Sequence, residues 1–206
     1  MSYTYNADGT LASKTDANGN TETYTYDAYQ RLTGIPDRQQ TFTYDTCPAN
    51  ATGCVSAPGQ LVQSTFGSNV GSNELNFEYN YAYTPAGKVS SKTLEVQSYK
   101  YVEGSSYAYG ALTASYTYDG QGALTSLVYP QCETWVICGT QTSFTYTLDA
   151  MERPTAMTNE NNHVWASGVT YNAANQPLYD GTAHRAYNNL LQLASISGAG
   201  MNTTYN

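Results

Sequence analysis

Few residues in this chain have the type and spacing that catalysis or metal binding requires. His163 and His184 are the only two histidines, and neither stands in a metal-binding or nucleophile-elbow motif. Asp149 and Glu152 could act as a general acid and base, but both occupy positions that a turn explains. Residues 16–20 partly resemble a calcium loop, yet they lack its glycine and its bidentate glutamate. We therefore expect no catalytic residues, no metal site and no cofactor, and predict that the chain is not an enzyme.

The four cysteines occur as two close pairs, Cys47 with Cys54 and Cys132 with Cys138. Such local pairs favour two disulfides that staple loops, in a protein exported to an oxidising compartment. Each bridge would contribute about 2.5 kcal/mol in the chain-entropy model. A zinc site is an alternative, although its ligand pairs usually stand closer together than these. Free thiols are the third possibility.

The elements that carry these residues follow from a repeated stretch, which is clearest in residues 3–32. Two tyrosines alternate with threonine, and then come an Asn or Asp, a short turn and a leucine. Period-two alternation of good strand formers predicts β-strands. Asn/Asp-x-x-Gly predicts a turn in which the side-chain oxygen bonds the backbone and glycine adopts a positive φ. One such hairpin cannot bury its own apolar face, so neighbouring hairpins must stack.

The same pattern recurs with decay along the chain, and we predict a single array of about eight units over residues 1–206, cut from a longer protein. The strand and turn positions that define the repeat are Tyr3, Tyr5, Gly9, Leu11, Tyr24, Tyr26, Asp27, Leu32, Tyr44, Asp45, Tyr81, Tyr83, Gly87, Tyr116, Tyr118, Asp119, Gly122, Leu124, Tyr146, Asp149, Tyr171, Tyr187 and Tyr205. The longer intervals between units are interpreted as loop insertions, with inserted loops near residues 46–58 and 128–140. Residues 186–196 are the best helix candidate, but the repeat alignment favours a strand there.

Composition narrows the possible partners. The net charge of -8, with only 8 lysines and arginines, argues against binding to nucleic acid or acidic membranes. No apolar run is long enough for a membrane helix, and no signal peptide is visible. The 21 tyrosines are expected to pack as ladders between successive hairpins, and the alternative is an aromatic surface that binds sugars or peptides.

The combination Y-x-Y-D-x-x-G-x-L resembles the RHS or YD repeat of bacterial polymorphic toxins, insecticidal toxin-complex subunits and animal teneurins. The resemblance covers essentially the whole chain and is strongest at residues 3–32 and 116–124. It implies stacked antiparallel β-hairpins wound into a spiralling sheet that closes into a hollow shell, which in the toxins encloses an unfolded cargo. The Asp-Pro motifs of the family's self-cleaving region do not occur in this chain.

The resemblance leads us to expect a non-catalytic segment of the shell of an exported protein, secreted or held at the cell surface. Its partners would be other repeats of the same protein and an enclosed C-terminal toxin or effector. The alternative is an extracellular binding or self-assembling module, in which tyrosine-rich surfaces or open strand edges engage glycans or further copies of the chain.

Overall fold

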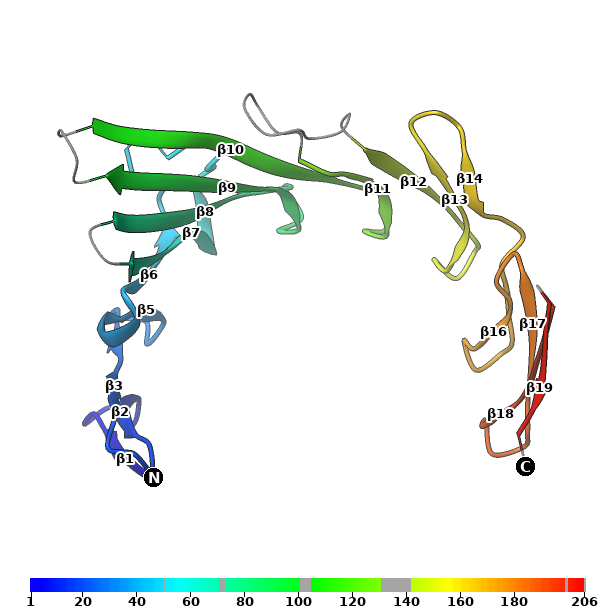
Figure 1. Ribbon diagram of the computed structural model, residues 1–206, viewed down its shortest axis with the longest axis horizontal. Coiled ribbons are helices and arrows are strands. Elements are labelled where there is room, and N and C mark those ends of the chain that lie inside the picture. The colour runs from blue at the N-terminus through cyan, green and yellow to red at the C-terminus, as the bar shows by residue number, and fades with distance from the viewer. Residues whose placement is uncertain (50, 71–72, 101–104, 131–141, 199, 206) are drawn as a thin grey trace. The chain divides into compact units, whose positions relative to one another are not determined.

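The computed structural model describes residues 1–49, 51–70, 73–100, 105–130, 142–198 and 200–205 (Figure 1). Within these ranges the chain consists of β-strands and connecting turns, and the helical content is a single 3₁₀ turn, η1 (Pro36–Arg38). The all-β prediction is therefore confirmed. Among these described residues, no helix is long and apolar enough to cross a membrane.

Contacts divide the chain into two compact units, the first built mainly from Met1–Ser115 and the second from Tyr116–Tyr129 and Gln141–Asn206. The strands that begin in the first unit are β1 (Ser2–Tyr5), β2 (Leu11–Thr15), β3 (Thr21–Thr23), β4 (Thr25–Tyr26), β5 (Leu32–Ile35), β6 (Gln40–Asp45), β7 (Ala57–Val70), β8 (Asn73–Tyr83), β9 (Val89–Lys100) and β10 (Ser105–Tyr118). Those of the second unit are β11 (Leu124–Val128), β12 (Ser143–Leu148), β13 (Pro154–Asn159), β14 (Val164–Ala166), β15 (Thr170–Tyr171), β16 (Pro177–Tyr179), β17 (Ala183–Tyr187), β18 (Leu193–Gly198) and β19 (Met201–Thr204).

Strands that follow one another in the sequence are also neighbours in the sheets. Strands β1 to β3 form one sheet, β4 to β14 form a second, and β15 to β19 form a third, each in sequence order. The registers within these sheets are antiparallel. Within each sheet the chain is thus a succession of hairpins, because each strand pairs with the strands directly before and after it in that sheet.

Strands β7 to β10 are longer than the others, with 14, 11, 12 and 14 residues. The prediction that the long interval from Tyr44 to Tyr83 is a loop insertion is therefore wrong in part. Residues 46–49 and 51–56 do lie outside the strands, but β7 begins at Ala57 and the rest of the interval lengthens a hairpin. Apolar residues alternate with polar ones in β8 from Leu75 to Tyr81, and Phe66 of β7 stacks on Phe77 with ring centroids 4.9 Å apart.

Two smaller predictions also need correction. Tyr24, expected on a strand, lies between β3 and β4. Residues 186–196, expected to be one strand, instead contain the end of β17, a turn at Asn188–Gln192 and the start of β18. The chain forms a turn here and not a helix, because the Asn188 side chain accepts hydrogen bonds from the backbone N–H groups of Leu190 and Gln192, at 2.9 and 3.0 Å.

The most buried side chains of the described residues lie in the first unit, on β7, β8 and β9. Val62, Asn80 and Thr93 are fully buried, and Gln63 and Ala82 nearly so. Gln63, Asn80, Thr93 and then Thr113 are direct cross-strand partners, so they form one polar row along a single face of the sheet. A polar row can be buried only if its members bond to one another, and these side chains do so.

Candidate functional site: the junctions between repeats

Many of the hairpin turns share one backbone geometry. In nine five-residue segments the first N–H donates to the fifth carbonyl, and the fourth N–H donates back to the first carbonyl. These segments begin at Asn6, Asp16, Asp27, Thr84, Asp119, Asp149, Asn159, Asn172 and Asn188. At Asp27, for example, the carboxylate accepts from the N–H groups of Tyr29 and Arg31, at 2.8 and 2.9 Å. The Asx side chain therefore holds the loop closed at its start.

The fourth residue of each turn has a positive φ, which is the position where the repeat motif places glycine. Gly9, Gly19, Gly87 and Gly122 occupy it with φ between 78° and 94°. The remaining turns put other residues there, namely Gln30, Glu152, Asn162, Asn175 and Leu191. A non-glycine residue in this region costs about 1–2 kcal/mol, so these turns are held by their surroundings rather than by local preference.

A β-bulge follows many of the turns, and no sequence pattern had indicated it. Tyr26 pairs with Leu32 but Thr25 pairs with Gly34, so Thr33 is an extra residue in its strand. Register shifts at the same place identify the extra residues as Ala12, Thr33, Val62, Ser90, Thr155, Trp165, Leu178 and Ala194. A bulge removes a residue from the regular ladder and increases the local twist.

At four junctions the second aromatic residue of the motif joins a repeat to the one before it. The Tyr44 hydroxyl donates to the Leu32 carbonyl at 3.0 Å, next to the bulge at Thr33. The other hydroxyl–carbonyl pairs of this kind are Tyr83 with Leu61 at 2.5 Å, Tyr171 with Pro154 at 2.7 Å and Tyr187 with Pro177 at 3.0 Å. In all four pairs the carbonyl directly precedes the extra residue of a bulge. The hydroxyl thus supplies a partner to a carbonyl that lies where the ladder is disrupted.

This contact changes the interpretation of the tyrosines. The sequence predicted packing ladders of rings, whereas at these four junctions the tyrosine reaches the preceding repeat through its hydroxyl. Burial raises the pKa of Tyr44 and of Tyr83 above the usual value, so both remain protonated donors at neutral pH.

Arg31 links one turn to the next within the first unit. Its Nε donates to Asp27 Oδ2 of its own turn at 2.7 Å, and its Nη1 and Nη2 donate to the two Asp45 oxygens at 3.1 and 2.6 Å. The guanidinium carbon also lies 4.4 Å from the centre of the Tyr44 ring. One planar side chain therefore joins two carboxylates and one aromatic face, which is a geometry that lysine cannot reproduce.

Arg153 plays the same part in the second unit. Its Nε donates to Asp149 Oδ2 at 2.8 Å, and its Nη1 donates to the Asn172 carbonyl at 3.3 Å in the next turn. It also lies over the ring of Tyr171, 4.6 Å from its centre. Gln176 continues the series, because its Nε2 donates to the Leu191 carbonyl of the following turn at 2.7 Å.

The arginines set the ionisation of these carboxylates. Hydrogen bonds from Arg31 and from the Gly59 N–H lower the pKa of Asp45 to about 2. The bond from Arg153 lowers the pKa of Asp149. In the same way the Asp45 carboxylate raises the pKa of Arg31. All three groups are therefore charged over the whole neutral range, and the links between the turns persist there.

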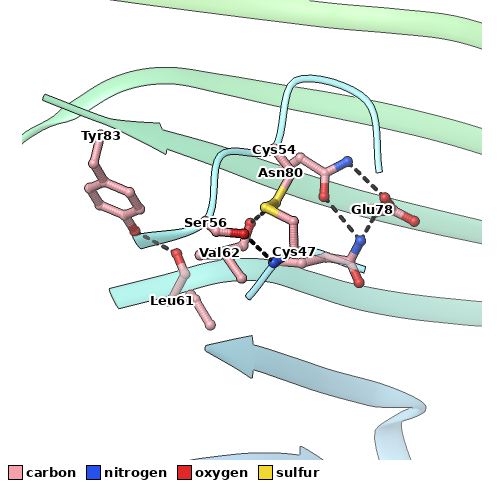
Figure 2. The surroundings of a disulfide bond; sticks show 9 residues. Cys47, Cys54, Ser56, Leu61, Val62, Glu78, Asn80 and Tyr83 are labelled. Atoms are coloured by element: carbon pink, nitrogen blue, oxygen red, sulfur yellow. Dashed lines mark hydrogen bonds between the residues drawn. A yellow bond between two sulfur atoms is a disulfide. The ribbon is translucent and has the colours of Figure 1, made fainter. Parts of the chain in front are cut away.

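The inserted loop after β6 is held by a disulfide between Cys47 and Cys54 (Figure 2). The Cys47 N–H donates to Ser56 Oγ at 2.9 Å, and the Val55 N–H donates to the Tyr81 carbonyl at 3.1 Å. The loop is thereby anchored at its base and also to β8. The predicted second pair, Cys132 and Cys138, lies outside the described residues.

This loop packs against the polar row of the long strands. Gly53 has a φ of 68°, and a side chain placed on it would collide with the Thr93 hydroxyl. Beside it, Gln63 Nε2 donates to Asn80 Oδ1 at 3.0 Å and to Glu78 Oε1 at 2.7 Å, and Figure 2 shows Glu78 also accepting from Asn80. Thr93 bonds to Thr113 at 2.8 Å. The loop covers the polar row, and the hydrogen bonds within the row satisfy its side chains without water.

The residues considered for chemistry occupy structural positions. Asp149 begins a turn and Glu152 is the positive-φ residue of that same turn. His163 ends another turn, where its N–H donates to Asn159 Oδ1 at 2.9 Å. His184 stacks on Tyr179 with ring centroids 4.5 Å apart. Among the described residues, no three His, Cys, Asp or Glu side chains gather in a way that could hold a metal ion.

Comparison with known proteins supports the repeat interpretation. A family model described as RHS Repeat matches residues 5–41. The crystal structure of TcdB2-TccC3-TEV aligns with 98% of this chain, with a TM-score of 0.64 and 14% identity. The crystal structure of TcdB2-TccC3 without its hypervariable C-terminal region aligns with 94%, with a TM-score of 0.62 and 13% identity. No curated protein sequence matches.

These structural likenesses show a shared fold. The chain spans about a tenth of the length of each of these two similar chains, at 10% coverage in both cases. The chain is thus similar to RHS/YD-repeat proteins, in sequence over residues 5–41 and in fold over the described strands.

Proposed function

We propose that this chain is a non-catalytic segment of the wall of an exported RHS-repeat shell, and that the shell encloses a toxin or effector. The observation that carries the proposal is the junction between repeats. Successive hairpins are tied together by tyrosine hydroxyls at four junctions, by arginine or glutamine across three turns, and by antiparallel pairing within each of the three sheets. Links of this kind between successive hairpins are what a wall requires.

Two further observations support the proposal. The fold is shared with TcdB2-TccC3 chains, one of which is described as being without its hypervariable C-terminal region. The Cys47–Cys54 disulfide is suited to an oxidising, exported setting. Within the described residues the polar and charged groups are used in turns and junctions, so the chain's own chemistry is directed at holding the wall together.

The proposal can be tested on the full-length protein that carries these repeats. Protease should spare the segment that follows the repeats while the shell is intact, and should digest it after the junctions are broken. Arg31→Glu combined with Arg153→Glu breaks two junctions, because each variant places a carboxylate against another carboxylate. Arg38→Glu provides a matched control, since Arg38 pairs with Glu22 outside the turn series. Equal digestion of that segment in the intact protein and in the double variant would contradict enclosure.

A further inference from the structure

An aromatic cluster in the second unit has no role in the junctions between repeats. Tyr129 follows β11, Phe144 lies on β12 and Trp165 lies on β14, three strands of one sheet (Figure 1). The rings of Tyr129 and Phe144 are 5.9 Å apart with an interplanar angle of 86°. Those of Phe144 and Trp165 are 6.4 Å apart at 66°, and His163 meets Trp165 edge-on at 5.1 Å.

The cluster is open to solvent in spite of its size. Trp165 is 58% exposed and Tyr129 is 48% exposed, while Phe144 between them is half-buried. Rings set nearly perpendicular to one another form a corner rather than a flat platform. A small group in such a corner can approach the faces of two rings at once, within roughly 6 Å of each centroid.

Elsewhere the chain places its own cations over half-buried rings. Arg31 lies over Tyr44 at 4.4 Å, Lys92 lies over Tyr79 at 3.7 Å and Arg153 lies over Tyr171 at 4.6 Å. Within the part of the chain that the structure describes, neither Lys nor Arg stands over Tyr129, Phe144 or Trp165. The cluster therefore differs from these other rings in offering faces without a cation.

The charges around the cluster favour a cationic occupant. The second unit contains five carboxylates and two guanidiniums. Both guanidiniums already pair with carboxylates, Arg153 with Asp149 and Arg185 with Asp180. Glu160 belongs to the turn beside the cluster, and its Oε2 accepts from the N–H of Ser143, the neighbour of Phe144, at 2.9 Å. A negative group thus lies near the corner, and no internal cation competes for it.

We propose that Tyr129, Phe144 and Trp165 form a binding site for a trimethylammonium group, the cationic head that choline and choline lipids share. Trimethylammonium is bulky, weakly hydrated and fully charged, so it gains from several ring faces and needs no hydrogen-bond donors or acceptors. The open corner suits a head group presented from solution or from a membrane surface. This inference is independent of the wall function, which would stand if the site did not bind.

The test is a titration of the chain with choline chloride, followed through the indole N–H signal of Trp165 in heteronuclear NMR spectra. The neutral isostere 3,3-dimethylbutan-1-ol is titrated in parallel, because it has the same shape without the charge. We expect saturable binding of choline and a much weaker response to the alcohol. Trp165→Leu should weaken choline binding about tenfold, followed through the Tyr129 ring signals, and Trp165→Phe should weaken it less.

Tyr205→Leu is the matched control, because Tyr205 is 48% exposed like Tyr129 but lies outside the cluster. It should leave choline affinity unchanged, whereas Tyr129→Leu should weaken it. Retention of the chain on phosphatidylcholine vesicles, lost in Trp165→Leu, would identify the lipid head as the source. Choline binding without retention would identify a soluble source. An equal response to the alcohol, no saturation, or full affinity in Trp165→Leu would overturn the proposal.

Discussion

At the scale of the residue, the junctions depend on a few side chains that each make several contacts. Arg31 bonds two carboxylates and covers a ring, and the Tyr44 hydroxyl bonds a carbonyl of the preceding repeat. The carboxylates and the tyrosine hydroxyls at the junctions respond to different changes. The carboxylates respond to pH, because their charged forms are stabilised, while the tyrosine hydroxyls respond only to removal of the donor.

The pKa of Asp45 leads to a prediction about acid stability. Because its pKa is lowered to about 2 in the folded chain, from an ordinary value near 4, ionised Asp45 stabilises the fold above about pH 4. That contribution is lost as the pH falls from about 4 to about 2. We expect denaturant midpoints to drop in this window, and to drop less in Asp45→Asn. A variant that followed the same curve as the parent chain would show that Asp45 is not responsible.

Removing a tyrosine hydroxyl at a junction tests the link between repeats. Tyr187→Phe leaves the ring but deprives the Pro177 carbonyl of its donor, so unfolding should become easier by about 1 kcal/mol. Chemical denaturation measures this directly. Tyr205→Phe serves as the control, since its hydroxyl has no such partner among the described residues, and it should be nearly neutral. Equal effects of the two variants would refute the role of the hydroxyl.

At the scale of the element, the inserted loop and the turns are controlled by backbone conformation and by what lies beneath them. Gly53 and Gly59 both have positive φ, at 68° and 80°, yet their surroundings differ. A Cβ at Gly53 would meet the side chain of Thr93, whereas a Cβ at Gly59 would meet nothing within 4 Å. Alanine at Gly59 therefore reports the cost of backbone strain alone, whereas alanine at Gly53 adds a collision with Thr93.

Gly53→Ala should be more destabilising than Gly59→Ala. Both variants lose the freedom of glycine at positive φ, which costs about 1–2 kcal/mol. Gly53→Ala must in addition displace the loop from the buried polar row, so its unfolding midpoint should be the lower of the two. Thermal or urea unfolding measures the two midpoints. Equal midpoints would mean that the loop moves away from Thr93 without a cost in stability.

Breaking the disulfide should loosen the loop and leave the sheet in place. Paired Cys47→Ser and Cys54→Ser substitutions remove a short covalent loop, with an expected loss of about 2–3 kcal/mol. Hydrogen exchange should rise at the Val55 N–H and at the β7 and β8 amides under the loop. The far-UV circular dichroism should keep its β signal. Loss of that signal would show that the loop is needed to form the strands.

At the scale of the whole molecule, hairpins that pair only with their sequence neighbours make stability a local property. Each sheet follows the sequence order, with contacts concentrated between adjacent strands. Repeat architectures of this kind behave as a series of nearest-neighbour interfaces. Damage at one junction should therefore spread through adjacent hairpins and fade with distance along the chain.

This locality can be measured with hydrogen exchange on Tyr187→Phe. We expect faster exchange in β16 to β19, which flank the broken bond, and unchanged exchange in β1 to β3. The matching experiment on Arg31→Gln should show the reverse pattern, with the change near β4 to β7. Uniform acceleration over all strands in either variant would mean that the chain unfolds as a single cooperative unit.

The sequence alone determined the strands, the turns and the order of the hairpins. Alternating Tyr and Thr have period two, and Asx-x-x-Gly closes a turn through contacts within five residues, so both can be recognised locally. The pairing of Cys47 with Cys54 was also accessible, because the two are close in the sequence. The resemblance to RHS/YD-repeat proteins followed from the same motif.

The tertiary structure alone decided how the repeats are joined. The bulge after each turn depends on the register between two strands, and nothing in the identity of Thr33 or Thr155 marks it as the extra residue. The tyrosine and arginine links join residues 10 to 22 positions apart, and the buried row from Gln63 to Thr113 spans four strands. Such contacts exist only once the strands are placed side by side, because each partner belongs to a different strand or turn, and no local pattern specifies the distance between them.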